Sequence, residues 1–267
     1  MKRDQHAPAV SSSPASDRLH LLDRLRVELA RLEGPARGRA TGSLPLGLAA
    51  IDAWLPGGGL ARGCLHEIAG PPAGDTAAAG FAAALLGRLA KGGPVVWIGP
   101  RSELYGPGLL ELGLDPARLI VVRARDRRGR LWALEEVLRS PGPGAGLAEI
   151  DQLDLTASRR LQLAAEAQGV TALLLRPERA LRQPSAAFTR WRIQALPADA
   201  PSGAALATAG AGSWAPARWQ VELVRARTGR PGQWVVEWRA GDWHEVPDPL
   251  ALAAEPGDRP APAARRA

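Results

Sequence analysis

The sequence predicts an α/β protein in which a mainly parallel central sheet is flanked by helices, and three observations indicate this. The 267 residues are 46% hydrophobic, which is enough for one core of about 200 residues plus tails. Between residues 43 and 195, short apolar runs alternate with longer helical patterns, the rhythm of parallel strands joined by helices. Residues 214–239 then change to an alternating period, which is typical of a C-terminal antiparallel hairpin.

The amino-terminal part of the chain divides into three segments before this core. Residues 1–16 are rich in Pro and Ser and predict a disordered arm, and residues 17–33 predict an amphipathic helix ending at Gly34. Residues 34–42 form a Gly/Arg linker, so the helix is tethered outside the core. Its apolar face docks either on its own core or in the groove of a partner. The residues of that face are Leu22, Leu25, Leu29 and Leu32.

The predicted core domain spans residues 43–240. Its expected strands are 64–69, 94–98, 119–123 and 171–175, with a shorter apolar run at 147–150. Its expected helices are 76–89, 106–112, 131–139 and 156–168. The hairpin pairs residues 219–225 with 234–238, after a mobile loop at about 197–213. Residues 241–267 are an Ala/Pro/Arg segment that predicts a disordered tail.

Composition excludes several classes of protein. No run of 18 or more apolar residues occurs, so we expect no membrane span and no membrane partner. No leader pattern opens the sequence, which predicts a cytoplasmic location. Cys64 is the single cysteine, which excludes a disulfide framework and a cysteine-rich zinc site. The other residue patterns indicate no metal and no cofactor.

The net charge of +7 favours polyanionic partners such as nucleic acid, although all but two of the 34 basic residues are arginine, as GC-rich coding also produces. One arginine cluster has few acidic neighbours and predicts either a surface for DNA or an acidic partner, or a solvated loop. DNA bound there would be held weakly, without sequence preference and with steep salt dependence. The candidate residues are Arg123, Arg125, Arg127, Arg128 and Arg130, with Arg190 and Arg192 in a second segment, 181–192.

Residues 44–76 carry the most informative pattern, LPLGLAAIDAWLPGGGLARGCLHEIAGPPAGDT. This pattern resembles the entry to the phosphate loop in the RecA recombinase superfamily. The resemblance continues through residues 97–115 and through Ala133-Leu134-Glu135, and covers about residues 40–240. It implies a RecA-like core, in which residues 186–193 and the final hairpin match the last strands.

Within that superfamily the chain is most similar to the ImuA family. The residues that carry this likeness are Leu-Pro-Gly-Gly-Gly at 55–59, Leu65-His66-Glu67, and Ser158-Arg159-Arg160-Leu161. The resemblance implies an accessory role in mutagenic translesion synthesis during the SOS response to DNA damage. The implied partners are RecA, ImuB and an error-prone DnaE-type polymerase. A cell-division inhibitor similar to SulA, which shares a degenerate RecA-like core, is the alternative from another class.

The phosphate loop itself departs from the superfamily pattern. A working loop reads Gly-x-x-x-x-Gly-Lys-Ser/Thr, in which backbone N–H groups and the lysine hold the phosphates. Here the nucleotide-binding candidates are Gly70, Gly74, Asp75 and Thr76. The glycine spacing is one residue short, Pro71 and Pro72 lack N–H donors, and an aspartate replaces the lysine. A charge pair at 4 Å is worth about 4 kcal/mol, and Asp75 reverses its sign. Asp75 and Thr76 also suit the start of any helix.

The other residues of ATP hydrolysis are missing or uncertain too. Arg101 occupies the position where the resemblance places the glutamate that activates water, and the acid that would hold magnesium is Glu149 or Asp151. His66 has no histidine nearby, and no serine lies in a Gly-x-Ser-x-Gly elbow. The sequence therefore predicts a pseudo-ATPase without catalytic residues, against the alternative of an atypical, DNA-dependent ATPase that remodels its partners.

Overall fold

The computed structural model describes residues 42–71, 76–100, 104–197, 217–239 and 241–246. The strands of its main sheet are β3 (Leu65–Gly70), β4 (Val95–Gly99), β5 (Leu119–Arg123), β6 (Ala145–Glu149), β7 (Thr171–Pro177), β8 (Thr189–Leu196), β9 (Ala217–Ala226), β10 (Gly232–Arg239) and β11 (Asp242–Val246). The helices are α2 (Ala49–Trp54), α3 (Ala77–Leu89), α4 (Gly106–Glu111), α5 (Arg127–Arg139) and α6 (Leu155–Gln168). Single 3₁₀ turns are η1 (Ala90–Gly92), η2 (Pro116–Arg118) and η3 (Glu178–Arg182), and a small ladder pairs β1 (Ser43–Leu44) with β2 (Leu60–Ala61).

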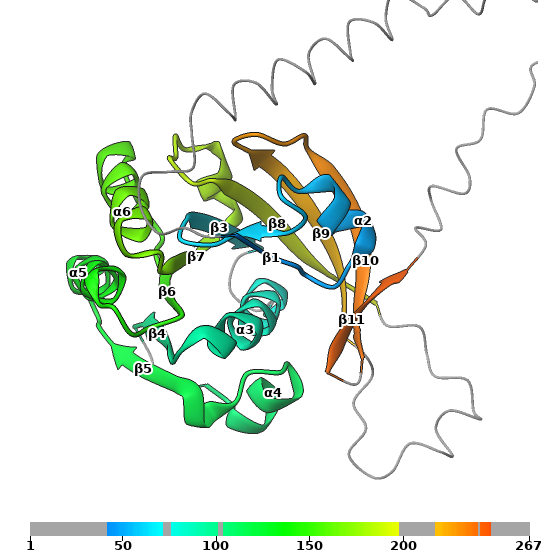
Figure 1. Cartoon of the computed structure of the whole chain (residues 1–267), viewed down its shortest axis with the longest axis horizontal. Helices are drawn as coiled ribbons and strands as arrows, with labels where there is room; N and C mark the ends of the chain where they lie inside the picture. Colours follow the sequence, from blue (N-terminus) through cyan, green and yellow to red (C-terminus); the bar gives the residue numbers. More distant parts are fainter. Residues whose placement is uncertain (1–41, 72–75, 101–103, 198–216, 240, 247–267) are drawn as a thin grey trace, which may run out of the picture.

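Among the described residues, the main sheet has nine strands, in the order β11-β10-β9-β8-β3-β7-β6-β4-β5 (Figure 1). The six strands from β8 to β5 are parallel to one another, and β9 to β11 continue the sheet as antiparallel strands. This confirms the predicted mixed α/β class, with a large, mostly parallel sheet flanked by helices and a C-terminal antiparallel hairpin. β3, the strand before the Gly/Pro segment that resembles a phosphate loop, lies at the centre between β7 and β8.

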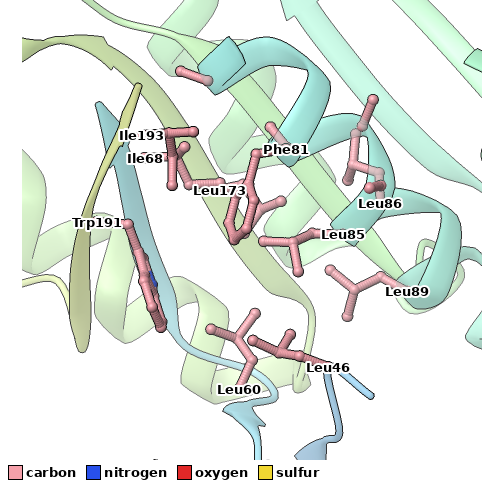
Figure 2. Close-up of a cluster of buried hydrophobic side chains, with 14 of the residues drawn as sticks. Leu46, Leu60, Ile68, Phe81, Leu85, Leu86, Leu89, Leu173, Trp191 and Ile193 are labelled. Atoms are coloured by element: carbon pink, nitrogen blue, oxygen red, sulfur yellow. The ribbon is translucent and has the colours of Figure 1, made fainter. Parts of the chain in front are cut away.

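Helix α3 covers one face of the sheet, and its alanine-rich sequence allows it to approach the strands closely. A Cβ on Gly70 would lie only 2.7 Å from the Cβ of Ala78, so the end of β3 touches the first turn of α3. Figure 2 shows Phe81 and Leu85 of α3 directed at Trp191 and the neighbouring strand residues of this core. Helices α5 and α6 cover the opposite face with a second apolar cluster.

An aromatic cluster holds the antiparallel part of the sheet against α3. The ring of Trp243 lies 5.0 Å from Phe81, 5.4 Å from Trp219 and 4.9 Å from Trp238, measured between centroids. The prediction that the core ends at residue 240 and that residues 241–267 are a disordered tail is therefore wrong for 242–246. Those residues form β11, because Trp243 is buried in this cluster.

Two further boundaries differ from the sequence prediction. Helix α5 begins at Arg127, four residues earlier than expected, because the Asp126 carboxylate caps it by accepting the Gly129 N–H at 2.7 Å. The strand that the resemblance places at residues 186–193 is β8, which begins later, at Thr189, and ends at Leu196 in the interior of the sheet. Arg127 and Arg128 therefore lie on a helix, and Arg190 and Arg192 lie on a strand.

Several predicted segments lie outside the described residues. They are the arm 1–16, the helix 17–33 with Leu22, Leu25, Leu29 and Leu32, the linker 34–42 apart from its last residue, most of the loop 197–213, and the tail from 247. Among the helices that are described, none has the length and apolar character needed to cross a membrane.

Candidate functional site

The candidate site lies where the central strand β3 ends. The carboxyl ends of parallel strands are where α/β proteins bind ligands, and here Gly70 of β3 aligns with Pro177 of β7. Gly70 is buried beneath α3, and Thr76 is exposed at the start of α3, where its carbonyl accepts the Gly80 N–H at 2.8 Å. Gly74 and Asp75 lie outside the described residues, as does Arg101.

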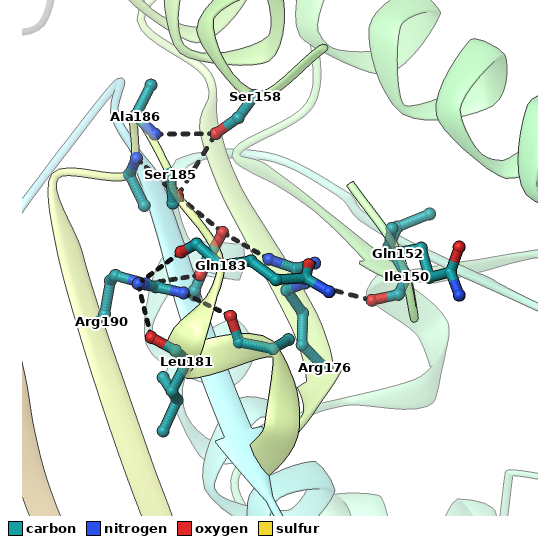
Figure 3. A network of polar contacts seen from close by, with 12 residues as sticks. Ile150, Gln152, Ser158, Arg176, Leu181, Gln183, Ser185, Ala186 and Arg190 are labelled. Carbon is teal, nitrogen blue, oxygen red and sulfur yellow. Dashed lines mark hydrogen bonds and ion pairs between the residues drawn. The ribbon is translucent and has the colours of Figure 1, made fainter. Parts of the chain in front are cut away.

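A buried carboxylate, Glu67, lies three residues before the end of β3. Its side chain is 1% exposed, and both of its oxygens accept hydrogen bonds from charged donors. Oε1 accepts from Arg176 Nη1 at 3.0 Å and from Ser185 Oγ at 2.7 Å, and Oε2 accepts from Arg190 Nε at 2.7 Å. We call these four residues the Glu67 cluster; Figure 3 shows Arg176, Ser185 and Arg190 converging.

The two arginines of the Glu67 cluster also hold the chain that follows β7. Arg190 donates to the carbonyls of Leu181, Gln183 and Ala180 at 2.8–3.1 Å, and Arg176 donates to the Ile150 carbonyl and to the Gln183 side chain. Burial lowers the pKa of Arg176, and the neighbouring Glu67 carboxylate opposes that shift. The cluster thus fixes η3 and the start of β8 on the core.

A hollow of about 410 Å³ lies beside this cluster, lined by Pro177, Glu178, Arg179, Leu181, Arg182 and Arg192. Arg192, one of the predicted patch residues, is held between two carboxylates, Glu178 at 3.0 Å and Glu222 at 2.6 Å. Arg179 and Arg182 are exposed. The hollow therefore has a basic rim that attracts anions, and the Glu178 carboxylate in its lining is paired with Arg192.

The acidic candidates for magnesium do not converge on the end of β3. The Glu149 carboxylate accepts the Trp97 indole N–H at 2.8 Å, so one of its oxygens is engaged within the sheet. Asp151 is exposed two residues further on. Across the described ranges, no group of three or more His, Cys, Asp or Glu side chains is placed to hold a metal ion.

The predicted arginine patch divides when the chain folds. Arg123, Arg125, Arg127 and Arg128 are exposed together, at the end of β5 and the start of α5. Arg130 is buried instead, and its Nη1 donates to the carbonyls of Ala124 and Arg125 at 3.2 and 2.7 Å. Arg190 is buried in the Glu67 cluster. The prediction that Arg130 and Arg190 contribute to a surface patch is therefore corrected, because both guanidinium groups satisfy interior carbonyls or carboxylates.

His66 is buried and has a structural set of partners. Its Nε2–H donates to the Ala61 carbonyl at 2.8 Å, and its Nδ1 accepts from the Thr189 hydroxyl at 2.7 Å, which itself accepts the Trp191 indole N–H. Because the Ala61 carbonyl can only accept, it selects the tautomer of the neutral imidazole that carries its proton on Nε2. Burial accordingly lowers the pKa of His66 to about 4.

Sequence reasoning missed the Glu67 cluster, although the sequence holds a signal for it. Glu67 and Arg176 each lie within a buried strand, and a charge in such a strand requires a buried partner. The partners of Glu67 lie 109 and 123 residues away along the chain. Local patterns cannot pair residues at such a separation.

The fold and the site together define a class of protein. It consists of mainly parallel α/β proteins covered by helices, in which a Gly/Pro segment without lysine follows the central strand. No family model matches the chain. It is 43% identical over 235 residues to Protein ImuA of Caulobacter vibrioides strain NA1000 / CB15N, covering 83% of this chain and 93% of that relative. Protein ImuA of strain ATCC 19089 / CIP 103742 / CB 15 matches to the same extent. The chain belongs to the ImuA family.

Proposed function

We propose that this chain is an accessory protein of mutagenic translesion synthesis after DNA damage, a RecA-like pseudo-ATPase that works by binding rather than by catalysis. Its proposed partners are RecA, ImuB and an error-prone DnaE-type polymerase. The observation that carries the proposal is Asp75 in place of the phosphate-loop lysine, in a chain that belongs to the ImuA family. The partners come from the resemblance to that family.

Two features of the fold support binding without ATP turnover. The central strand ends under α3 with Gly70 against Ala78, followed by Pro71, which offers no N–H to a phosphate. The charged groups nearest this end are used internally, because Glu67 is bound by two arginines and Glu149 by Trp97. Phosphoryl transfer depends on positioned cations, magnesium and a residue that orients the nucleophile.

ATP turnover by the purified full-length protein tests the pseudo-ATPase. We expect a rate no higher than the buffer blank, with and without single-stranded DNA. A matched pair of variants is Thr76→Ala, at the start of α3, and Thr156→Ala, exposed in the first turn of α6. Turnover that Thr76→Ala abolishes and Thr156→Ala keeps would show an active, atypical ATPase and overturn the proposal.

The cellular role is tested separately by deleting the gene and counting mutants after ultraviolet damage. We expect damage-induced mutation to fall to the level of undamaged cells, and the Thr76→Ala gene to restore it. An unchanged mutation frequency in the deletion strain would contradict the role in translesion synthesis. Restoration by the wild-type gene alone would contradict the pseudo-ATPase part of the proposal.

A further inference from the structure

The β5 end of the sheet is open and unusually apolar for a surface. Within the described part of the chain, β5 is the terminal strand and pairs with β4 alone. Among the described residues, five of the seven large apolar side chains that are exposed lie in the segment 105–132, which forms this end. They are Tyr105 at the start of α4, Leu110 of α4, Ile120 and Val121 of β5, and Trp132 of α5. Figure 1 shows α4, β5 and α5 gathered at one side of the molecule.

The backbone of β5 is free to accept another strand. The Ala124 N–H donates to the Gly99 carbonyl at 2.9 Å, so the backbone groups of Ala124 face β4. Because backbone groups alternate along a strand, the N–H and C=O of Val121 and Arg123 point away from the sheet. Natural edge strands are usually protected by lysine, proline or a bulge. In β5 the central positions are instead Ile120, 50% exposed, and Val121.

Positive charge surrounds the same edge. Arg123, Arg125, Arg127 and Arg128 are exposed, and across the described part of the chain no ion pair involves any of them. The nearby Asp126 carboxylate is used as the cap of α5. Two of the arginines lie in the first turn of α5, where the helix dipole already supplies positive potential. The potential at this edge therefore favours carboxylates.

We propose that β5 binds an extended, acidic segment of a partner protein as an additional strand of the sheet. Main-chain hydrogen bonds to Val121 and Arg123 would provide affinity, and the apolar side chains and arginines would select alternating apolar and acidic residues. This interface rests on the proposed function, because it assigns a surface by which an accessory protein holds its partner.

The charge and shape of this edge favour an acidic strand over two other occupants, a second copy of the chain and single-stranded nucleic acid. A second copy of the chain would bring its own arginines against those of the first, which like-charge repulsion opposes. Single-stranded nucleic acid would use the arginines and the exposed rings of Tyr105 and Trp132, but would leave the outward backbone groups of β5 and Ile120 without partners. An acidic strand satisfies all of these groups at once.

The test uses the full-length protein and a synthetic ten-residue peptide of alternating valine and glutamate as the probe. Control peptides replace glutamate with lysine, or carry N-methyl groups on alternate backbone nitrogens. We expect the valine/glutamate peptide to bind at low salt, with at least tenfold weaker binding for each control peptide. On binding, hydrogen exchange of the Val121 and Arg123 amides should slow.

Protein variants assign the surface. Arg123→Glu with Arg125→Glu should weaken peptide binding at least tenfold, whereas Arg179→Glu with Arg182→Glu, an equal charge change in η3, should not.

Equal binding of the N-methylated peptide would overturn strand addition. Arginine-dependent binding of a single-stranded oligonucleotide without peptide binding, or a dimer that Ile120→Glu dissociates, would assign the surface to those occupants instead. Failure of the peptide while gene deletion still abolishes damage-induced mutation would refute this interface and leave the proposed function standing.

Discussion

The end of β3 and the edge at β5 are both rich in arginine, but their arginines differ in burial and in partners. In the Glu67 cluster, Arg176 and Arg190 are buried, and both are paired with the Glu67 carboxylate. At the β5 edge, Arg123 and Arg125 are exposed and have no ion pair among the described residues. Arginine content alone therefore does not locate a binding surface. The position of the carboxylates decides whether an arginine stabilises the fold or remains available.

Removing the carboxylate of the Glu67 cluster should have the largest effect on stability. Glu67→Ala would leave two buried guanidinium groups without their counter-charge, and breaking a buried ion pair in this way costs about 3–5 kcal/mol. Urea denaturation of the variant against wild type measures the change. Arg123→Ala, at the exposed edge, should change stability by less than about 0.5 kcal/mol. Equal losses of stability in the two variants would contradict this difference between the buried and the exposed arginines.

Acid should weaken the interior through His66. The folded pKa of about 4 is below that of an unfolded histidine, so the unfolded chain binds a proton first as the pH falls. The stabilisation from neutral His66 is therefore complete above about pH 6.5 and is lost between there and pH 4, by about 3 kcal/mol in total. Denaturation at a series of pH values measures the slope.

A His66→Gln variant provides the control for this pH dependence. It should be less stable than wild type at neutral pH, because the bonds to Ala61 and Thr189 are altered. Its stability should also vary less between pH 6.5 and 4 than that of wild type. An unchanged slope in the variant would show that other groups cause the acid sensitivity.

A smaller effect, of opposite sign, is expected at the start of α5. Arg128→Glu should stabilise the protein by about 0.3–1 kcal/mol, because a negative charge suits the first turn of a helix and the arginine opposes the dipole. Arg139→Glu, in the last turn of the same helix, should destabilise it. Thermal melting at low salt distinguishes the two. Loss of stability in Arg128→Glu would show that this arginine has a structural role.

The smallest effect on stability is expected for the predicted helix 17–33, which lies outside the described residues. Leu25→Glu with Leu29→Glu should leave the melting of the core unchanged while abolishing co-purification with RecA or with ImuB. Four leucines, at about 1.5–3 kcal/mol each when buried, are enough for such a contact. Retained binding would place the interface elsewhere, for example at β5, and loss of melting cooperativity would show that the helix belongs to the core.

The order of helices and strands was predictable because it follows from local patterns. The alternation of apolar runs located each parallel strand from β3 to β7, and the change of period located β9 and β10. Predictions were wrong where a contact between distant residues decides the outcome. β11 forms because Trp243 packs on Phe81, which is far from it in sequence. The start of α5 is an exception, because it depends on a local contact, the Asp126 cap on the Gly129 N–H.

Neighbouring residues alone were enough to predict the class of fold and the family resemblance, and they show that the Gly/Pro segment after β3 holds no lysine. Only the tertiary structure decided which arginines are available. Glu67 meets Arg190 across 123 residues, and Arg130 turns inward onto carbonyls, while Arg123 and Arg125 stay in solvent. The physical reason is that burying a charge is costly unless a partner is placed beside it, and only folding places that partner.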